Sequence, residues 1–316
     1  MKTLALLLAL GSVWLLSVVA HAESTRQPLP SLNVAALAAS DTQLFVGSFD
    51  AGLYVVERDG RARHLDDPAL SAHINALAWS EREGMLWLGT ARGVARCRLG
   101  AGCERLGPTS AVHALLLRND GSLVAGADAG LIFIAGEHTE SIGKKQGASY
   151  RSVWSLAESR EGTLFVGASN GLFWGDAHAA RQGGQLSRAS IVTGALPDDW
   201  VTALLVQGSH VRVGTYNSGV VSFHWLAGHL STESADPTLG YVNPAGVLAT
   251  SEDTLAFATM DGLRTGVLGD TQLRETKGRD ITAILPAWQG GYWIGTRHGL
   301  EWARLDGDIA VVGYQR

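Results

Sequence analysis

The chain has 316 residues, and hydrophobic residues make up 46% of them against 17% charged residues. This composition excludes intrinsic disorder, which needs low hydrophobicity and high charge. The balance of 25 Lys and Arg against 30 Asp and Glu gives a net charge of −5 without a basic stripe, so no nucleic-acid partner is expected. Glycine is in excess, with 39 residues where a usual share of roughly 7% would give about 22, and this excess indicates recurring turns.

The first segment of the chain has the pattern of a secretory signal peptide. Met1-Lys2 precedes an almost wholly apolar run from Leu4 to Ala20, and Ala20-His21-Ala22 supplies the small residues of a cleavage site. We therefore predict a signal peptide over 1–22, cleavage after Ala22, a leader over 23–31, and a periplasmic or secreted product without a stable membrane span. An uncleaved membrane anchor is the alternative, and no Cys follows the run to carry a lipid.

Residues 32–316 contain seven repeats of about 41 residues, each with room for four short strands. This pattern predicts an all-β fold, a single seven-bladed β-propeller of four-stranded antiparallel blades. A β-sandwich or a β-helix is the competing architecture. We expect the seventh blade to be complete by Tyr314, so that the ring closes without a strand exchanged between the first and last blades. The expected blades are 32–71, 72–109, 110–150, 151–198, 199–242, 243–279 and 280–316.

Two glycine columns recur in the repeats. One column ends the second strand of each repeat, at Gly47, Gly89, Gly126, Gly167, Gly214 and Gly295. In the sixth repeat Ala258 takes the place of the glycine. The other lies four or five residues later, in the turn before the third strand, where a hairpin often needs a positive φ. It is present in all seven repeats, at Gly52, Gly93, Gly130, Gly171, Gly219, Gly262 and Gly299.

The innermost strands carry a column of small residues, which would let strands crowd around a central axis. Its members are Ala36, Ala76, Ala114, Ser155, Ala203, Val247 and Ala283, and a column of Leu or Ile follows. The aromatic residues of the second strands, Phe45, Trp87, Phe165 and Trp293, are expected to pack between blades.

The chain has only two cysteines, Cys97 and Cys103, and a glycine-rich spacer separates them. In an oxidising compartment this pair favours a disulfide across a hairpin. Two sulfurs alone do not complete a tetrahedral metal shell, so we expect neither a metal site nor a cofactor here.

The phrases Leu86-Trp87-Leu88-Gly89-Thr90 and Trp293-Ile294-Gly295-Thr296, each followed by a Gly-led strand, resemble the two-component-regulator propeller repeat. The resemblance covers residues 32–316. It implies a periplasmic sensor-type propeller that perceives ligands, here as a stand-alone exported domain that would need a separate signalling partner.

First-strand starts and the turns between second and third strands share one face of a propeller, so they define a candidate surface around the channel mouth. Aromatic, Arg and His side chains gather there, as in binding interfaces. The candidate ligand- or partner-binding residues are His73, Asn75, His113, Arg151, Trp154, Asp199, Trp200, Tyr216, Arg279, Arg297 and His298. Ten histidines are present but show no close metal-ligand spacing.

The leading hypothesis is an exported, monomeric propeller that binds a ligand or an envelope protein. One alternative is a lyase or hydrolase with its active site at the channel mouth, although no nucleophile elbow, phosphate loop or dinucleotide fingerprint is present. Another alternative is a structural assembly factor of an envelope complex. No catalytic residue stands out, and the fold class does not choose between these functions.

Overall fold

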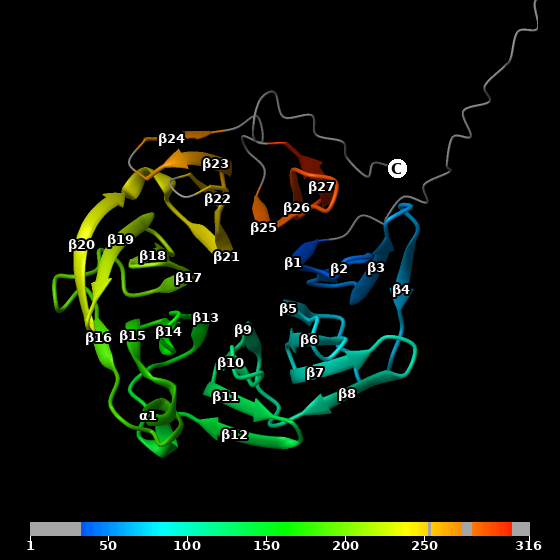
Figure 1. Ribbon diagram of the computed structural model, residues 1–316, viewed down its shortest axis with the longest axis horizontal. Helices are drawn as coiled ribbons and strands as arrows, with labels where there is room; N and C mark the ends of the chain where they lie inside the picture. Colours follow the sequence, from blue (N-terminus) through cyan, green and yellow to red (C-terminus); the bar gives the residue numbers. More distant parts are fainter. Residues whose placement is uncertain (1–32, 252–253, 269, 274–279, 305–316) are drawn as a thin grey trace, which may run out of the picture.

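The computed structural model describes residues 33–251, 254–268, 270–273 and 280–304 and shows a seven-bladed β-propeller (Figure 1). The predicted fold is confirmed. The signal peptide over 1–22, the leader over 23–31, Arg279 and the expected end of the seventh blade at Tyr314 lie outside the described residues. No helix among the described residues has the length and apolar character that crossing a bilayer requires.

Each blade is an antiparallel sheet whose strands follow chain order from the axis outward. Blade 1 contains β1 (Val34–Ala39), β2 (Gln43–Ser48), β3 (Leu53–Glu57) and β4 (Ala62–Leu65). Blade 2 contains β5 (Ile74–Ser80), β6 (Met85–Thr90), β7 (Gly93–Arg98) and β8 (Gly102–Leu106). Blade 3 contains β9 (Val112–Leu117), β10 (Leu123–Ala127), β11 (Gly130–Ala135) and β12 (His138–Ile142). Blade 4 contains β13 (Val153–Glu158), β14 (Thr163–Ala168), β15 (Gly171–Asp176) and β16 (Ser187–Ala189).

The remaining blades repeat this plan. Blade 5 contains β17 (Val201–Gln207), β18 (His210–Thr215), β19 (Val220–Leu226) and β20 (His229–Asp236). Blade 6 contains β21 (Val242–Ala249), β22 (Leu255–Thr259), β23 (Gly262–Val267) and β24 (Asp270–Leu273). Blade 7 has three described strands, β25 (Ile281–Pro286), β26 (Tyr292–Thr296) and β27 (Gly299–Ala303). Helix α1 (Ala177–Arg181) and the short 3₁₀ turns η1 (Lys144–Gln146) and η2 (Pro237–Leu239) lie in connecting segments.

The hydrophobic core of the described residues is divided into seven clusters, one at each interface between neighbouring blades. The cluster between blades 7 and 1 packs Trp293 and Leu300 against Val34 and Val46, and thereby joins the two ends of the described chain. Phe45, Phe165 and Trp293 are almost fully buried, and Trp87 is 5% exposed, so the aromatic residues of the second strands do pack between blades.

The two glycine columns have different physical causes. The seven turn glycines have φ between +69° and +145°, the region that only glycine occupies readily. The strand-ending glycines do not have a positive φ in that region. They make room for the next blade, because a Cβ on Gly126 would lie 2.5 Å from Val153 and one on Gly295 would lie 2.5 Å from Val34. The strand-ending glycines therefore serve packing between blades, whereas the glycine excess by itself indicated only turns.

The sixth blade corrects one column read from the sequence. In blade 1 the small residue Ala36 pairs with the strand-ending Gly47. In blade 6 Val247 pairs with Phe257, so Gly246, and not Val247, takes the small-residue place opposite Ala258. The inner strand of blade 6 thus carries the glycine and the second strand the alanine, so that a small residue still lies opposite a small residue. The repeat pattern did not predict this exchange, because β21 has two more residues before the small-residue position than the other inner strands have.

Candidate functional site

A bulge in every inner strand determines which side chains line the channel mouth. The pairing of each inner strand with its neighbour shifts just after the strand's first residue. A bulge leaves one residue unpaired and turns its side chain in a new direction. In six blades a single residue lies at the bulge, and these residues are Ala35, Asn75, His113, Trp154, Thr202 and Thr282. In blade 6 the bulge holds Asn243, Pro244 and Ala245.

Three of the bulge residues fasten one blade to the next. Asn75 Nδ2 donates to the Val112 carbonyl oxygen at 3.0 Å, and Thr202 Oγ1 donates to the Val242 carbonyl at 2.6 Å. Asn243, which is 5% exposed, donates in the same way to the Ile281 carbonyl. In each case the acceptor is the first residue of the next inner strand. Blades 3 and 4 instead carry rings at this place, His113 and Trp154.

In blades 1, 2, 3 and 5 the turn between the second and third strands is hydrogen-bonded to the segment just before the inner strand. The amide of Tyr216 donates to the Trp200 carbonyl, and the amide of Asp128 donates to the Ala111 carbonyl, each at 3.0 Å. Equivalent bonds join Phe49 to Asn33 and Ala91 to His73. The residues that precede the inner strands and those in these turns therefore share one face, which we call the mouth face.

Five rings from four blades form a continuous line on the mouth face, which we call the aromatic row: His113, Trp154, Trp200, Tyr216 and Tyr241. The His113 and Trp154 rings stack with centroids 4.0 Å apart and planes at 16°, and Trp200 stacks on Tyr216 at 4.3 Å and 11°. Trp154 meets Trp200 at 5.4 Å, and Tyr241 meets Tyr216 edge-on at 5.0 Å. Such pairs add about 0.5–1.5 kcal/mol each beyond area burial.

Carboxylates hold the row in place. His113 Nε2 lies 2.9 Å from Asp128 Oδ1, so the histidine ring is positioned by the turn of its own blade. Asp198 accepts from the backbone amides of Trp200 at 3.0 Å and Asn217 at 2.8 Å, which joins the strand start to the turn that carries Tyr216.

Polar groups flank the far end of the row. Burial, followed by the charge of Asp280, raises the pKa of Tyr241 to about 12, so this phenol stays neutral. Asp280 itself pairs with Arg297 and accepts from Asn243. The carboxylate is thereby neutralised on one side by the guanidinium.

The structure brings together some of the residues expected from the sequence and leaves others apart. His113, Trp154, Trp200 and Tyr216 are in the row, and Asn75 lies beside it at the channel. Asp199 accepts from the Ile191 amide at 2.7 Å and so shapes the loop before β17. The remaining described candidates, His73, Arg151, Arg297 and His298, are exposed on the mouth face, and within the described segments no ring contact or ion pair joins them to the row.

Sequence reasoning missed Tyr241, Asp198, Thr202 and Pro244. Tyr241 immediately precedes an inner strand, as Trp200 does, so the column of residues before these strands carried the signal. The longer bulge of β21 hid it by shifting the sixth repeat. Among the described residues, no three His, Cys, Asp or Glu side chains gather as a metal site.

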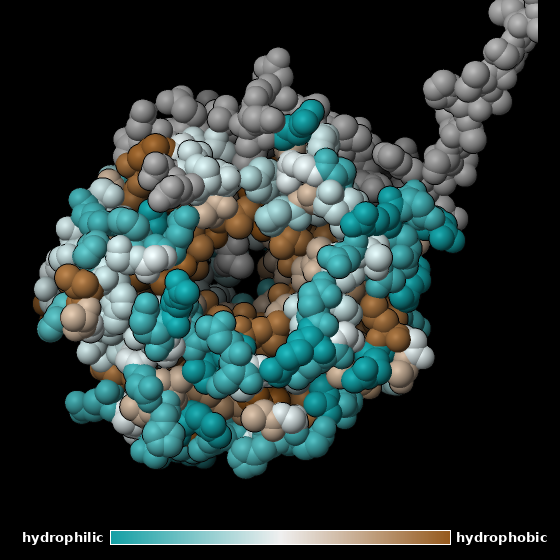
Figure 2. All heavy atoms as spheres, viewed as in Figure 1, coloured by the Kyte–Doolittle hydropathy of each residue, from teal (hydrophilic) through white to brown (hydrophobic). Residues whose placement is uncertain are grey.

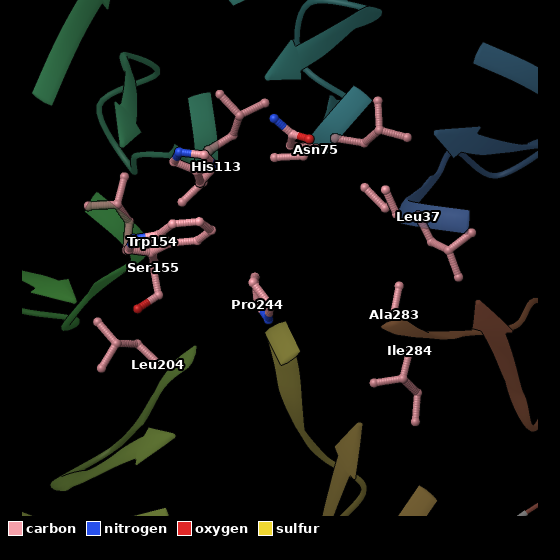
Figure 3. Close-up of a pocket in the computed structure, with 16 residues that line it drawn as sticks. Leu37, Asn75, His113, Trp154, Ser155, Leu204, Pro244, Ala283 and Ile284 are labelled. Atoms are coloured by element: carbon pink, nitrogen blue, oxygen red, sulfur yellow. The ribbon is translucent and has the colours of Figure 1, made fainter. Parts of the chain in front are cut away.

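The channel beside the row holds a pocket of about 140 Å³, which we call the mouth pocket (Figure 3). Alanine and leucine side chains of the inner strands form most of its wall, together with Asn75, His113 and Trp154. Pro244, placed by the long bulge of β21, points toward the middle of the channel (Figure 3). Figure 2 shows the same centre as a hollow ringed by hydrophobic residues.

The predicted disulfide is present. Cys97 and Cys103 are a cross-strand pair of β7 and β8, with Cα atoms 4.1 Å apart. The Cys103 amide also donates to Asp67 at 3.0 Å, which ties this outer hairpin to the loop between blades 1 and 2.

No family model matches the sequence, and no curated protein matches it either. The fold is similar to the extracellular domain of the one-component or hybrid two-component system BT4673 from B. thetaiotaomicron, at 17% identity and a TM-score of 0.68, over 87% of this chain and 39% of that domain. The fold is also similar to that of a streptogramin B lyase, at 11% identity and a TM-score of 0.66, over 86% of this chain and 93% of the lyase.

A third similar structure is PorZ, a surface component of the type-IX secretion system of Porphyromonas gingivalis, at 13% identity and a TM-score of 0.63. The similarity covers 90% of this chain and 38% of PorZ. This chain therefore spans well under half of BT4673's extracellular domain and of PorZ. At these identities the likeness establishes the propeller fold, which a sensor, a lyase and a secretion component share.

Proposed function

We propose that this chain is an exported binding module of the cell envelope that captures a ligand or a partner protein at its mouth face. The aromatic row is the observation that carries the proposal. Five rings line up across four blades, and Tyr216 is 40% exposed. Exposed aromatic residues with a polar rim are typical of binding surfaces, because they bury much area at a low entropic cost.

Two features support export. The N-terminal pattern over residues 1–22 is that of a cleaved signal peptide. The Cys97–Cys103 disulfide suits an oxidising compartment such as the periplasm. A sensing or assembly role would then place the module beside a signalling or envelope partner, in keeping with the resemblance to two-component-regulator repeats.

Photo-crosslinking from the row tests the proposal in the native envelope. A benzophenone amino acid replaces Tyr216 in the full chain, and the same residue replaces Trp174 in a control protein. Trp174 lies in β15 of blade 4 and bonds to the Gly228 carbonyl away from the row. We expect a discrete adduct from position 216 that position 174 does not give. Equal adducts from both positions, or none from 216, would refute binding at the mouth face.

One observation favours a second function, an enzyme. A histidine held by a carboxylate, as His113 is by Asp128, is the arrangement of a general base. Ser155 is the nearest hydroxyl in the pocket wall, but the Trp154 side chain lies between it and His113 (Figure 3). Turnover of a defined substrate that His113→Ala abolishes, with the crosslinked adduct retained, would favour the enzyme.

A further inference from the structure

We infer that the occupant of the mouth face is an extended polypeptide segment that inserts one uncharged, apolar side chain into the mouth pocket. The inference rests on the proposed function and specifies its ligand. It follows from the size of the pocket, the charge of its wall and the way in which the aromatic row uses its ring faces.

The wall of the pocket selects an apolar, uncharged group. Leu37, Leu77, Leu115 and Leu156 contribute to it together with the alanines of the inner strands. His113 is the only titratable side chain among its lining residues, and Asp128 already accompanies that ring. A charged group entering this wall would lose its hydration without meeting an Asp, Glu, Lys or Arg side chain of opposite charge.

The size of the pocket restricts the group to a single side chain. Pockets that enclose whole drug-sized ligands measure about 300–1,000 Å³, whereas this pocket measures about 140 Å³. An apolar cavity of roughly 150 Å³ takes up one benzene molecule. The pocket therefore suits one leucine, methionine or phenylalanine side chain.

The apolar surface continues beyond the pocket, so the occupant is elongated. Trp154 belongs to both the pocket wall and the row, and the row continues through Trp200 to the exposed Tyr216. Val192 is 88% exposed. The amide of its neighbour Ile191 donates to Asp199, which directly precedes Trp200 in the chain. A molecule that fills the pocket and also covers these residues must extend over blades 3 to 5.

The row favours a polypeptide over a glycan. A sugar ring binds by lying on an open aromatic face, and the stacks of His113 on Trp154 and of Trp200 on Tyr216 already occupy one face of each of these four rings. Most of the pocket wall is leucine and alanine, which offer a sugar hydroxyl no hydrogen-bond partner, and its polar side chains are limited to Asn75, His113, Trp154 and Ser155. The carboxylates that could bind such hydroxyls are already engaged, since Asp128 faces His113 and Asp198 accepts two backbone amides.

Selection from a random 12-residue peptide library displayed on phage tests the inference with the purified full-length chain. We expect the selected peptides to share one apolar residue at one position and to bind the chain with a micromolar Kd. Filling the pocket by Ala114→Leu, or by Ala76→Leu as an independent variant, should weaken binding at least about tenfold. Ala135→Leu is the matched control, because Ala135 is exposed at the end of β11 that lies away from the mouth face, in the same blade as Ala114, and is outside the pocket.

Several outcomes would overturn the inference. These are a selection without enrichment, selected peptides without a shared apolar residue, and peptides that bind both filled variants as well as the unmodified chain. A glycan array distinguishes a failure of the peptide assignment from a failure of the proposed binding function. Binding of a glycan that Trp200→Ala abolishes, without any selected peptide, would overturn the peptide assignment and leave the proposed function standing.

Discussion

The aromatic row makes a quantitative prediction that a double-mutant cycle can test. Trp200 stacks on Tyr216 with centroids 4.3 Å apart and planes at 11°, and such a pair contributes about 0.5–1.5 kcal/mol beyond the burial of its area. Trp200 also contacts Trp154. Because its side chain is only partly buried, we expect Trp200→Ala to lower the free energy of unfolding by about 2–3 kcal/mol, less than a fully buried Trp would.

The cycle isolates the stacking energy from burial. The variants are Trp200→Ala, Tyr216→Ala and the double substitution, each unfolded in urea with the fold checked by circular dichroism. We expect a coupling energy of about 0.5–1.5 kcal/mol between the two positions. The control cycle pairs Tyr216→Ala with Trp174→Ala, whose sites share no ring contact among the described residues, and it should be additive within about 0.3 kcal/mol. A coupling near zero for Trp200 and Tyr216 would refute the stacked row.

The remaining predictions concern stability. Replacing Cys97 and Cys103 together by alanine should lower the free energy of unfolding by about 2 kcal/mol, since the closed loop is short; a reductant should destabilise the unmodified chain by a similar amount and leave the double variant unchanged. Thr202→Val should cost about 1 kcal/mol in urea unfolding because it removes the bond to the Val242 carbonyl. Thr282→Val should be neutral or stabilising, because the buried Thr282 hydroxyl has no partner among the described residues; equal costs at both sites would contradict the role of the bulge threonine as a fastener between blades. Tyr241 ionises near pH 10 when unfolded and near 12 in the fold, so the stability that it contributes below pH 10 should be lost as the pH rises from about 10 to about 12. Unfolding measured across this range should show a smaller decline for Tyr241→Phe than for the unmodified chain, and parallel declines would contradict the raised pKa.

The row also shows how far the candidate site could be predicted. Trp154, Trp200 and His113 were identifiable because they lie at starts of inner strands, which a repeat alignment locates. Their mutual stacking was not, because it joins residues of three different blades whose separation depends on the packing between them. Tyr241 was missed for a local reason, the two additional residues in the bulge of β21, although Pro244 and Gly246 are residue types that often mark a bulge.

The sequence by itself determined the propeller, its turns and its disulfide. Hairpins, positive-φ glycines and the cross-strand cysteine pair depend on residues close together in the chain, and the hairpins and turn glycines recur in all seven repeats. Only the tertiary structure decided which side chains face the channel and which rings meet. A bulge is a property of the pairing between two strands, and the closed ring brings Val34 against Gly295, from opposite ends of the described chain. The aromatic row and the mouth pocket exist because blades that are about 40 residues apart in sequence pack side by side around one axis.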